Sequence, residues 1–259
     1  MKRLATDPGT PDTRALHARI AADLREEIMS GTLPPGAKLP STARLKARFD
    51  ASNATIQKAL LLLKEEGLVV GRAGASVTVR ENRQRTVRPA GSLTAASSGG
   101  GFPWLREAAG QGRAARSRLL SVGPAEVSGD IAAALAISEG ATAMLRRQLI
   151  DVDGEPSELV SSYYPLDLAE GTPLAEARKI KGGTPTLLGE LGHSPRLSVD
   201  RVSARIATQE QYAALRLSGD LPVLRTLRTV YDAADRPVEV TVMVKAGHLY
   251  ELQYEFAPE

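Results

Sequence analysis

Residues 30–41 read Ser-Gly-Thr-Leu-Pro-Pro-Gly-Ala-Lys-Leu-Pro-Ser, and this stretch decides how the N-terminal third of the chain is organised. Its prolines and glycines predict a tight, rigid connector, because proline fixes one backbone dihedral angle and glycine permits sharp turns. Before the connector, apolar residues recur every four positions from Leu16 to Ile28. That spacing predicts an amphipathic helix over about 13–29, ended by Gly31.

Two more helices and a hairpin are predicted after the connector. The helices cover 41–49 and 52–66, and each begins at a serine that can act as its N-cap. Asp50 takes the turn between them, since aspartate tolerates a left-handed backbone better than most residues. Short strands over 68–70 and 77–79 flank a basic tip. Helix, short helix, turn, helix and hairpin form the plan of a winged helix-turn-helix.

Positive charge is concentrated in this part of the chain. Residues 1–91 contain 16 Lys and Arg against 9 Asp and Glu, a net charge of +7, whereas residues 92–259 carry a net charge of −4. A chance imbalance is the alternative explanation. The division indicates a module that meets phosphate groups, joined to one that does not.

The sequence loses its periodicity between about 81 and 102, where the run Ala-Ala-Ser-Ser-Gly-Gly-Gly is typical of a flexible linker. Beyond it the pattern mixes strands and helices, and predominantly antiparallel strands indicate an α+β domain. We therefore predict a mobile tail over 1–12, a winged helix-turn-helix over 13–80, a linker over 81–102 and a second domain over 103–257. Strands are expected over 142–152, 158–164, 201–206, 223–231, 238–244 and 252–256, and helices over 131–137, 184–191 and 209–217.

Composition argues against several classes of protein. The chain has no cysteine, which excludes disulfides and thiolate sites, and it has no apolar run long enough to span a membrane. His17, His193 and His248 are isolated in sequence, so no metal site or other cofactor is expected. The closeness of Asp151 and Asp153 is explained better by their position where a strand meets a turn than by a role as a catalytic acid–base pair. We therefore expect a cytoplasmic protein that is not an enzyme.

Polar residues on the 52–66 helix are candidates for reading DNA, because the second helix of such a motif enters the major groove. The amides of Asn53 and Gln57 can pair with adenine, and Thr55 can touch a thymine methyl group. Basic residues around the short helix, Arg48 among them, lie where backbone phosphates would run. For any single residue the alternative is an ordinary solvated position. The expected DNA-contacting residues are Lys38, Thr42, Arg44, Lys46, Ser52, Asn53, Thr55, Gln57, Lys58, Arg72 and Gly74.

Two motifs in this region resemble the GntR family of bacterial transcription factors. They are the connector at 30–41 and the run Thr-Ile-Gln-Lys-Ala-Leu, continued by Leu-Lys-Glu-Glu-Gly-Leu-Val, within 55–69. The resemblance covers about residues 13–80. It implies that this part of the chain binds a DNA operator.

The chain also departs from that family's pattern. Members often carry Ser-Arg-x-Thr-Val-Arg at the start of the recognition helix, and here residues 52–57 read Ser-Asn-Ala-Thr-Ile-Gln. Two arginines that commonly contact DNA are thus replaced by the amides of Asn53 and Gln57. An acidic residue of the connector is replaced by Thr42, and a wing glycine by Ser76. Loss of guanine-seeking arginine predicts a different operator with more adenine contacts.

The rest of the chain resembles UTRA, the ligand-sensing domain of the HutC-type subfamily, over about 103–257. The matching pieces lie at 145–147, 152–156, 162–165, 171–174, 204–208 and 228–239. This resemblance implies a chorismate-lyase-like fold that binds small, often anionic metabolites. The residues matching its effector pocket are Arg146, Arg147, Ser161, Tyr163, Thr184, Arg205, Glu239 and Tyr254.

These candidates make chemical sense, because guanidinium groups clamp a carboxylate or phosphate through paired hydrogen bonds. The competing interpretation is structural ion pairing of Arg147 or Arg205 with Glu158, Glu190 or Glu239.

The sequence thus predicts a ligand-responsive transcriptional regulator, a repressor whose operator affinity depends on a small effector. A homodimer formed mainly through residues 103–257 would place two winged helices on a two-fold symmetric operator. One alternative is a constitutive repressor whose second domain only dimerises. The remote alternative is a lyase-like enzyme localised on DNA.

Overall fold

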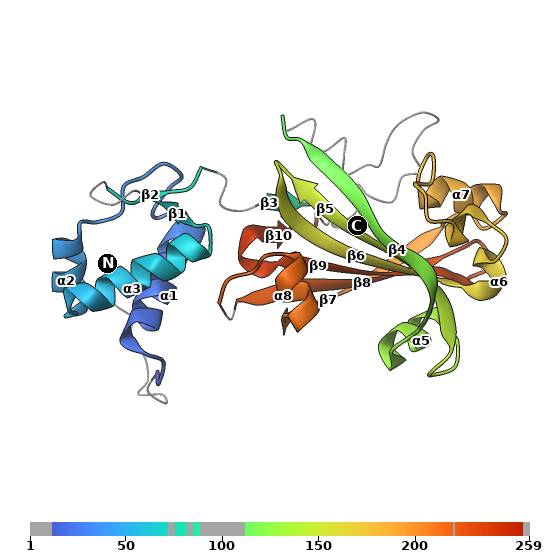
Figure 1. Cartoon of the computed structure of the whole chain (residues 1–259), viewed down its shortest axis with the longest axis horizontal. Coiled ribbons are helices and arrows are strands. Elements are labelled where there is room, and N and C mark those ends of the chain that lie inside the picture. Colours follow the sequence, from blue (N-terminus) through green and yellow to red (C-terminus); the bar gives the residue numbers. More distant parts are fainter. Residues whose placement is uncertain (1–11, 72–75, 82–84, 89–111, 220, 256–259) are drawn as a thin grey trace. The chain divides into compact units, whose positions relative to one another are not determined.

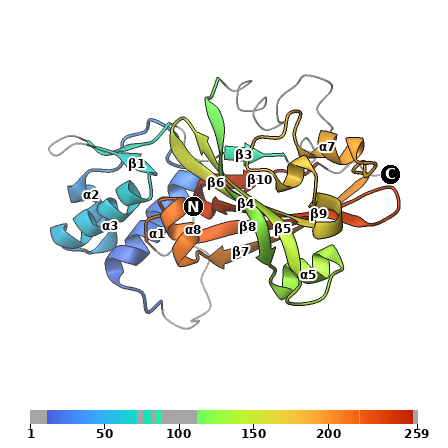
Figure 2. The same ribbon diagram turned by 45° about the vertical axis from the view of Figure 1, so that its right-hand side comes forward.

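The computed structural model describes residues 12–71, 76–81, 85–88, 112–219 and 221–255. The chain divides into two compact units, residues 1–84 and residues 85–259. Figures 1 and 2 show that the first consists mainly of helices, whereas the second is built on a twisted sheet. The predicted α+β class is confirmed.

The first unit is a winged helix-turn-helix, as predicted. Its core is a pair of apolar stripes, one on the first helix and one on the third, and each stripe contains four fully or almost fully buried residues. A two-stranded antiparallel hairpin follows the helices. The elements are α1 (Leu16–Met29), α2 (Thr42–Phe49), α3 (Asn53–Glu65), β1 (Val69–Val70) and β2 (Thr78–Val79).

The helix boundaries arise from the residues expected to set them. The hydroxyl of Ser41 accepts a hydrogen bond from the Arg44 N–H, and that of Ser52 accepts one from the Thr55 N–H. Asp50 ends α2 in the left-handed region, with φ of 46°. Local chemistry therefore fixes the turn between α2 and α3.

The connector does more than separate two helices. The Gly36 N–H donates to the Val79 carbonyl at 3.0 Å, and the Leu39 N–H donates to the Val77 carbonyl at 2.9 Å. In return the Val79 N–H donates to the Ala37 carbonyl at 2.9 Å. The connector thus lies along β2 and ties the start of the helix-turn-helix to the wing.

The second unit is built on one six-stranded antiparallel sheet in the order β4-β5-β6-β9-β8-β7. The pairs β5–β6 and β8–β9 are antiparallel hairpins, the first turning at Asp153-Gly154 and the second at residues 232–236. The strands are β4 (Ala115–Glu126), β5 (Thr142–Val152), β6 (Glu155–Pro165), β7 (Leu197–Ile206), β8 (Pro222–Tyr231) and β9 (Pro237–Ala246).

Short helices cover both faces of the sheet. One face, called the α5 face, packs Ile131 and Leu135 of a helix against sheet residues such as Leu227. The other, called the α7 face, packs Leu188 against Met144 and its neighbours. The helices are α5 (Gly129–Leu135) and α8 (Gln209–Ala214) for the first face, and α6 (Leu166–Ala169), η2 (Pro173–Ala175) and α7 (Thr184–Glu190) for the second.

Two strands were not expected from the sequence. β4 contains Gly123 and Pro124 and lacks a regular apolar alternation, and it forms an edge of the sheet, where proline is tolerated. β3 (Arg85–Val87) lies inside the 81–102 segment that was predicted to be a linker. The glycine run of that segment lies outside the described residues.

The last strand also differs from its prediction. β10 (Tyr250–Leu252) begins two residues before the expected strand and, instead of extending the six-stranded sheet, pairs in parallel with β3. A single 3₁₀ turn, η3 (Gly247–Leu249), precedes it. A parallel pair between two distant three-residue segments leaves no local signal in the sequence.

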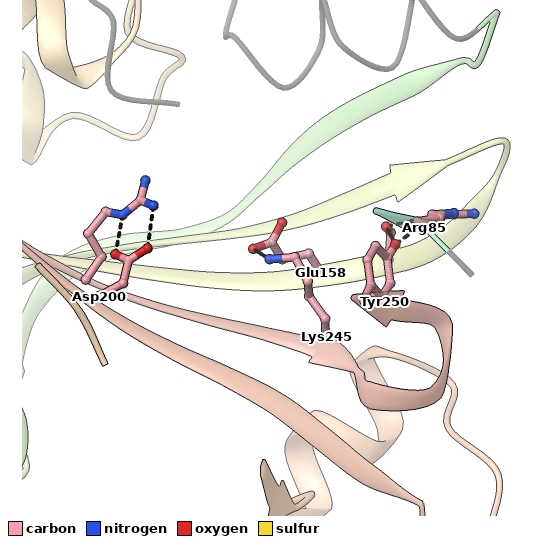
Figure 3. A network of polar contacts seen from close by, with 7 residues as sticks. Arg85, Glu158, Asp200, Lys245 and Tyr250 are labelled. Atoms are coloured by element: carbon pink, nitrogen blue, oxygen red, sulfur yellow. Dashed lines mark hydrogen bonds and ion pairs between the residues drawn. The ribbon is translucent and has the colours of Figure 1, made fainter. Parts of the chain in front are cut away.

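Side chains secure the β3–β10 pair. Arg85 donates from Nη1 to the hydroxyls of Tyr250 at 2.7 Å and Ser157 at 3.0 Å, and its guanidinium lies 5.5 Å from the centre of the Tyr250 ring (Figure 3). Burial raises the pKa of Tyr250. Figure 3 also shows Lys245 paired with Glu158. Arg85, the first residue of the second unit, is thus anchored to β10 and to the start of β6.

Candidate nucleic-acid interface and effector cavity

The polar face of α3 presents the predicted base-reading groups. Asn53 and Gln57 are exposed, as predicted, and the Gln57 amide donates to the Thr42 hydroxyl at 3.5 Å. The hydroxyls of Ser52 and Thr55 instead bond to each other at 2.9 Å. The two amides are therefore freer to contact bases than the two hydroxyls.

Four of the residues predicted to contact DNA are exposed cations without a counter-charge in the described part of the chain. Lys38, Arg44, Lys46 and Lys58 make no ion pair within the described residues. Arg48 differs, because it pairs with Glu27 and lies 4.6 Å from the centre of the Phe49 ring. Uncompensated positive charge is what attracts the phosphate backbone of DNA.

The remaining wing candidates, Arg72 and Gly74, lie outside the described residues.

A buried ion pair holds the recognition helix in place. Arg25 of α1 donates to both carboxylate oxygens of Glu66, from Nε at 2.8 Å and from Nη2 at 2.5 Å. Only 6% of the Glu66 side chain is exposed. The pair therefore fixes the end of α3 against α1.

The second unit contains a small cavity on the α7 face. It has a volume of about 40 Å³ and lies between β5, β6 and the segment that leads into α7. Arg146 and Thr184, two of the predicted effector contacts, line it. The full set of lining residues is Leu119, Arg146, Gln148, Ser162, Tyr164, Lys179, Ile180 and Thr184.

Two predicted effector contacts, Ser161 and Tyr163, do not line this cavity, because strand alternation directs their side chains to the other face of the sheet. Successive side chains on a strand point to opposite faces, so Ser162 and Tyr164 line the cavity, whereas Tyr163 packs against the core of the α5 face. Ser161 shares the register position of Arg147 and is also absent from the lining. The structure therefore places Ser162 and Tyr164 in the cavity lining, each one residue after the predicted Ser161 and Tyr163.

Two of the predicted arginines also lie elsewhere. Arg147 pairs with Glu210 of α8, and this contact lowers the pKa of the Glu210 carboxyl. Arg205 is exposed on β7 and donates to the Ser203 hydroxyl at 3.2 Å. Arg147 thus forms a structural ion pair, as in the competing interpretation, but with Glu210 instead of Glu158, Glu190 or Glu239.

Arg146 is buried and holds the chain that covers the cavity. Its Nη1 donates to the carbonyls of Leu174 and Glu176, both at 2.8 Å, and of Pro173 at 3.3 Å. Its Nη2 donates to the carbonyl of Arg178 at 2.7 Å. Burial lowers the pKa of Arg146, and its Nε has no partner among the described residues.

Tyr164 is a second buried polar group facing the cavity. Its side chain is 0% exposed, and burial raises its pKa well above 10.0. Ser162, Thr184 and Glu239 lie near its hydroxyl, but none of them is placed for a hydrogen bond of good geometry. Glu239 accepts a hydrogen bond from Thr241 at 2.6 Å, and burial raises the pKa of its carboxyl.

Glu239 thus lies behind the wall of the cavity, not in its lining. The last predicted residue, Tyr254, is 45% exposed and lies near Asp200 and Arg228. Sequence reasoning missed Gln148 and Lys179. Neither belongs to a motif that distinguishes it from ordinary surface residues.

Other chemistry is not apparent in the described part of the chain. No group of three or more His, Asp or Glu could hold a metal ion there, and no helix is long and apolar enough to cross a membrane. His193 has a structural role, because its Nδ1 lies within hydrogen-bond distance of Asp232 Oδ2, at 2.8 Å.

A winged helix whose exposed cations around α2 and α3 make no ion pair within the described residues, followed by a sheet domain with a polar cavity, defines a two-domain DNA-binding regulator. The chain belongs to the GntR family of bacterial regulatory proteins, whose family model matches residues 16–79, and it carries a UTRA domain over residues 110–251.

Relatives support the same assignment over the whole chain. PhnF of Escherichia coli strain K12 is named as a transcriptional regulator. It is 30% identical to this chain, and the match covers 97% of this chain and 99% of PhnF. An HTH-type transcriptional regulator of Streptomyces coelicolor, SCO4628, is 26% identical over 96% of this chain and 94% of its own. A crystal structure of a GntR-family regulator has a TM-score of 0.61 with 27% identity, covering 95% and 99% of the two chains. The chain is thus a transcriptional regulator, not an enzyme.

Proposed function

We propose that this chain is a repressor whose affinity for its operator is set by a small anionic effector bound in the cavity of the α7 face. The observation that carries the proposal is a pair of buried polar atoms, Tyr164 OH and Arg146 Nε, that lack a hydrogen-bond partner among the described residues and belong to residues that line this cavity. Buried donors and acceptors nearly always have partners in native proteins, so such atoms mark a place for a bound molecule. The lining supplies two cationic residues and no carboxylate.

DNA recognition would fall to α3 and the cations near it. Asn53 and Gln57 would read base edges, while Lys38, Arg44 and Lys46 would contact phosphates, because these groups are exposed and unpaired. A cytoplasmic location follows from this proposal, since operator DNA is found there.

A two-fold operator requires two copies of the chain, and β7 offers an edge for pairing them. Leu197, Val199 and Val202 are each more than 40% exposed, and Ile206 is 72% exposed. Edge strands of this kind readily pair with another chain. We infer that a second copy pairs with β7 in an antiparallel arrangement, which continues the sheet across the dimer.

Charge selects the register of this pairing. A two-fold axis at Val202 places Arg201 opposite Ser203 and Val199 opposite Arg205. An axis one position earlier places Arg201 opposite itself, and one position later it places Arg201 opposite Arg205. Like charges directly opposite each other destabilise a sheet. Of these three registers, the one centred on Val202 is therefore the favourable one.

An effector can change operator binding only if its affinity differs between the DNA-binding arrangement and another arrangement of the dimer. The test is a mobility-shift assay on the DNA upstream of the chain's own gene, with a panel of anionic metabolites first screened by thermal shift. We expect a metabolite that raises the melting temperature also to weaken operator binding. A panel that leaves both measurements unchanged would favour the constitutive repressor instead.

A further inference from the structure

The segment 173–181, called the covering segment, runs from η2 to the residues before α7 and contributes to the wall of the cavity. We propose that Lys179 of this segment contacts the anionic group of the effector, while Arg146 is a positioning residue that holds the segment in place. This inference rests on the proposed effector function and assigns roles within that site.

The guanidinium of Arg146 is already occupied by the protein. An arginine has five N–H donors, four of them on its two terminal nitrogens. These nitrogens contact four main-chain carbonyls between Pro173 and Arg178. Nη1 contacts three of these carbonyls and Nη2 contacts one, which leaves Nε and one N–H of Nη2 without a partner among the described residues. Arg146 therefore cannot clamp a carboxylate or phosphate through its two terminal nitrogens without releasing the covering segment.

Lys179 is placed differently. It follows Arg178, whose carbonyl is the last one held by Arg146, and it lines the cavity. Within the described part of the chain it makes no hydrogen bond or ion pair, whereas Arg178 is paired with Glu176. Lys179 is also exposed, so its ammonium group does not bear the desolvation cost of a buried charge. Lys179 is therefore a cation in the cavity lining that is available to pair with a bound anion.

The other walls provide neutral donors rather than charge. The Gln148 side-chain oxygen accepts a hydrogen bond from Ser117 at 2.6 Å, which leaves its amide N–H groups as donors. Ser162, Tyr164 and Thr184 contribute hydroxyls. One exposed ammonium in the same lining as several neutral donors suits a phosphate or carboxylate group, which accepts several hydrogen bonds at once.

The experiment compares single variants of the full-length chain. Lys179→Met removes the proposed contact, and Lys181→Met is the matched control, because Lys181 lies in the same segment and is exposed but does not line the cavity. Binding of inorganic phosphate and of acetate is measured by calorimetry. We expect Lys179→Met to weaken binding of the preferred anion about tenfold or more, and Lys181→Met to leave it unchanged.

Arg146 is tested by trypsin cleavage after Arg178, Lys179 and Lys181, which reports release of the covering segment. We expect Arg146→Met to accelerate this cleavage at least about tenfold, and Arg146→Lys, which retains the charge but loses the forked geometry, to accelerate it as well. Near-native circular dichroism of Arg146→Lys separates local release from global unfolding.

Two results would overturn the assignment of roles. One is phosphate and acetate binding that is undetectable in the wild type or equal in Lys179→Met and Lys181→Met. The other is unchanged cleavage in both Arg146 variants. Failure of the proposed regulatory function would look different, because anion binding and cleavage would follow expectation while operator affinity stayed constant.

Discussion

Replacing the two amides of the recognition helix, Asn53→Ala together with Gln57→Ala, tests how this regulator reads DNA. Both side chains are exposed, and Gln57 is steadied by its hydrogen bond to Thr42. A bidentate amide–adenine interaction is worth about 1–3 kcal/mol of discrimination. Removing two such interactions should therefore weaken operator binding by at least about 2 kcal/mol, or roughly 30-fold in Kd.

The assay is a fluorescence-anisotropy titration of an operator fragment at several salt concentrations. We expect the double variant to keep the wild-type slope of log affinity against log salt, because every phosphate-binding cation is still present. Lys46→Met should do the opposite, with a slope that is shallower by about 0.9 for each DNA phosphate that the lysine neutralises. Glu65→Gln, at the far end of α3, is the control and should not weaken binding. Wild-type affinity in the double variant would refute the assignment of base reading to these amides.

Three further changes probe other parts of the molecule. Gly36→Ala should destabilise the first unit by about 1–2 kcal/mol in urea denaturation, because Gly36 has φ of +73° and an L-residue is strained there; unchanged stability would contradict this. Val202→Glu should convert the proposed β7-paired dimer to a monomer in light scattering, whereas Val202→Thr should not. The hydrogen bond to His193 is the main reason that the pKa of Asp232 is lowered from 3.8. The ionised carboxylate therefore stabilises the folded state fully at pH values above 3.8, and this contribution is lost as the pH falls through the lowered pKa. Asp232→Asn should flatten this acid loss in thermal melts, and an unchanged pH profile would count against it.

Elements controlled by local chemistry were predictable from the sequence. Serine caps, a left-handed aspartate and apolar stripes defined α2 and α3, because each signal lies within a few residues of the structure it specifies. β5 matches its predicted bounds of 142–152 for the same reason. β4 and the β3–β10 pair were missed, since their partners lie far away in the sequence and the strands themselves lack a clear alternation.

The candidate cavity shows a different limit. Its lining depends on which of two adjacent residues points to the α7 face, and residues 161–164 read Ser-Ser-Tyr-Tyr. A doublet looks the same after a shift of one residue, although that shift moves every side chain to the opposite face. The same ambiguity affects Arg146 and Arg147. Only the register with the neighbouring strands determines which member faces the cavity.

The pairing of the connector with β2 also has a consequence for solubility of the regulator at high concentration. An open strand edge invites pairing with other chains. β2 is bonded to β1 on one side and to residues 36–39 on the other, so both of its edges are occupied. The Pro-Gly stretch that positions the reading helix therefore also protects the wing from edge-to-edge aggregation, even while the exposed edge of β7 stays open to a second copy.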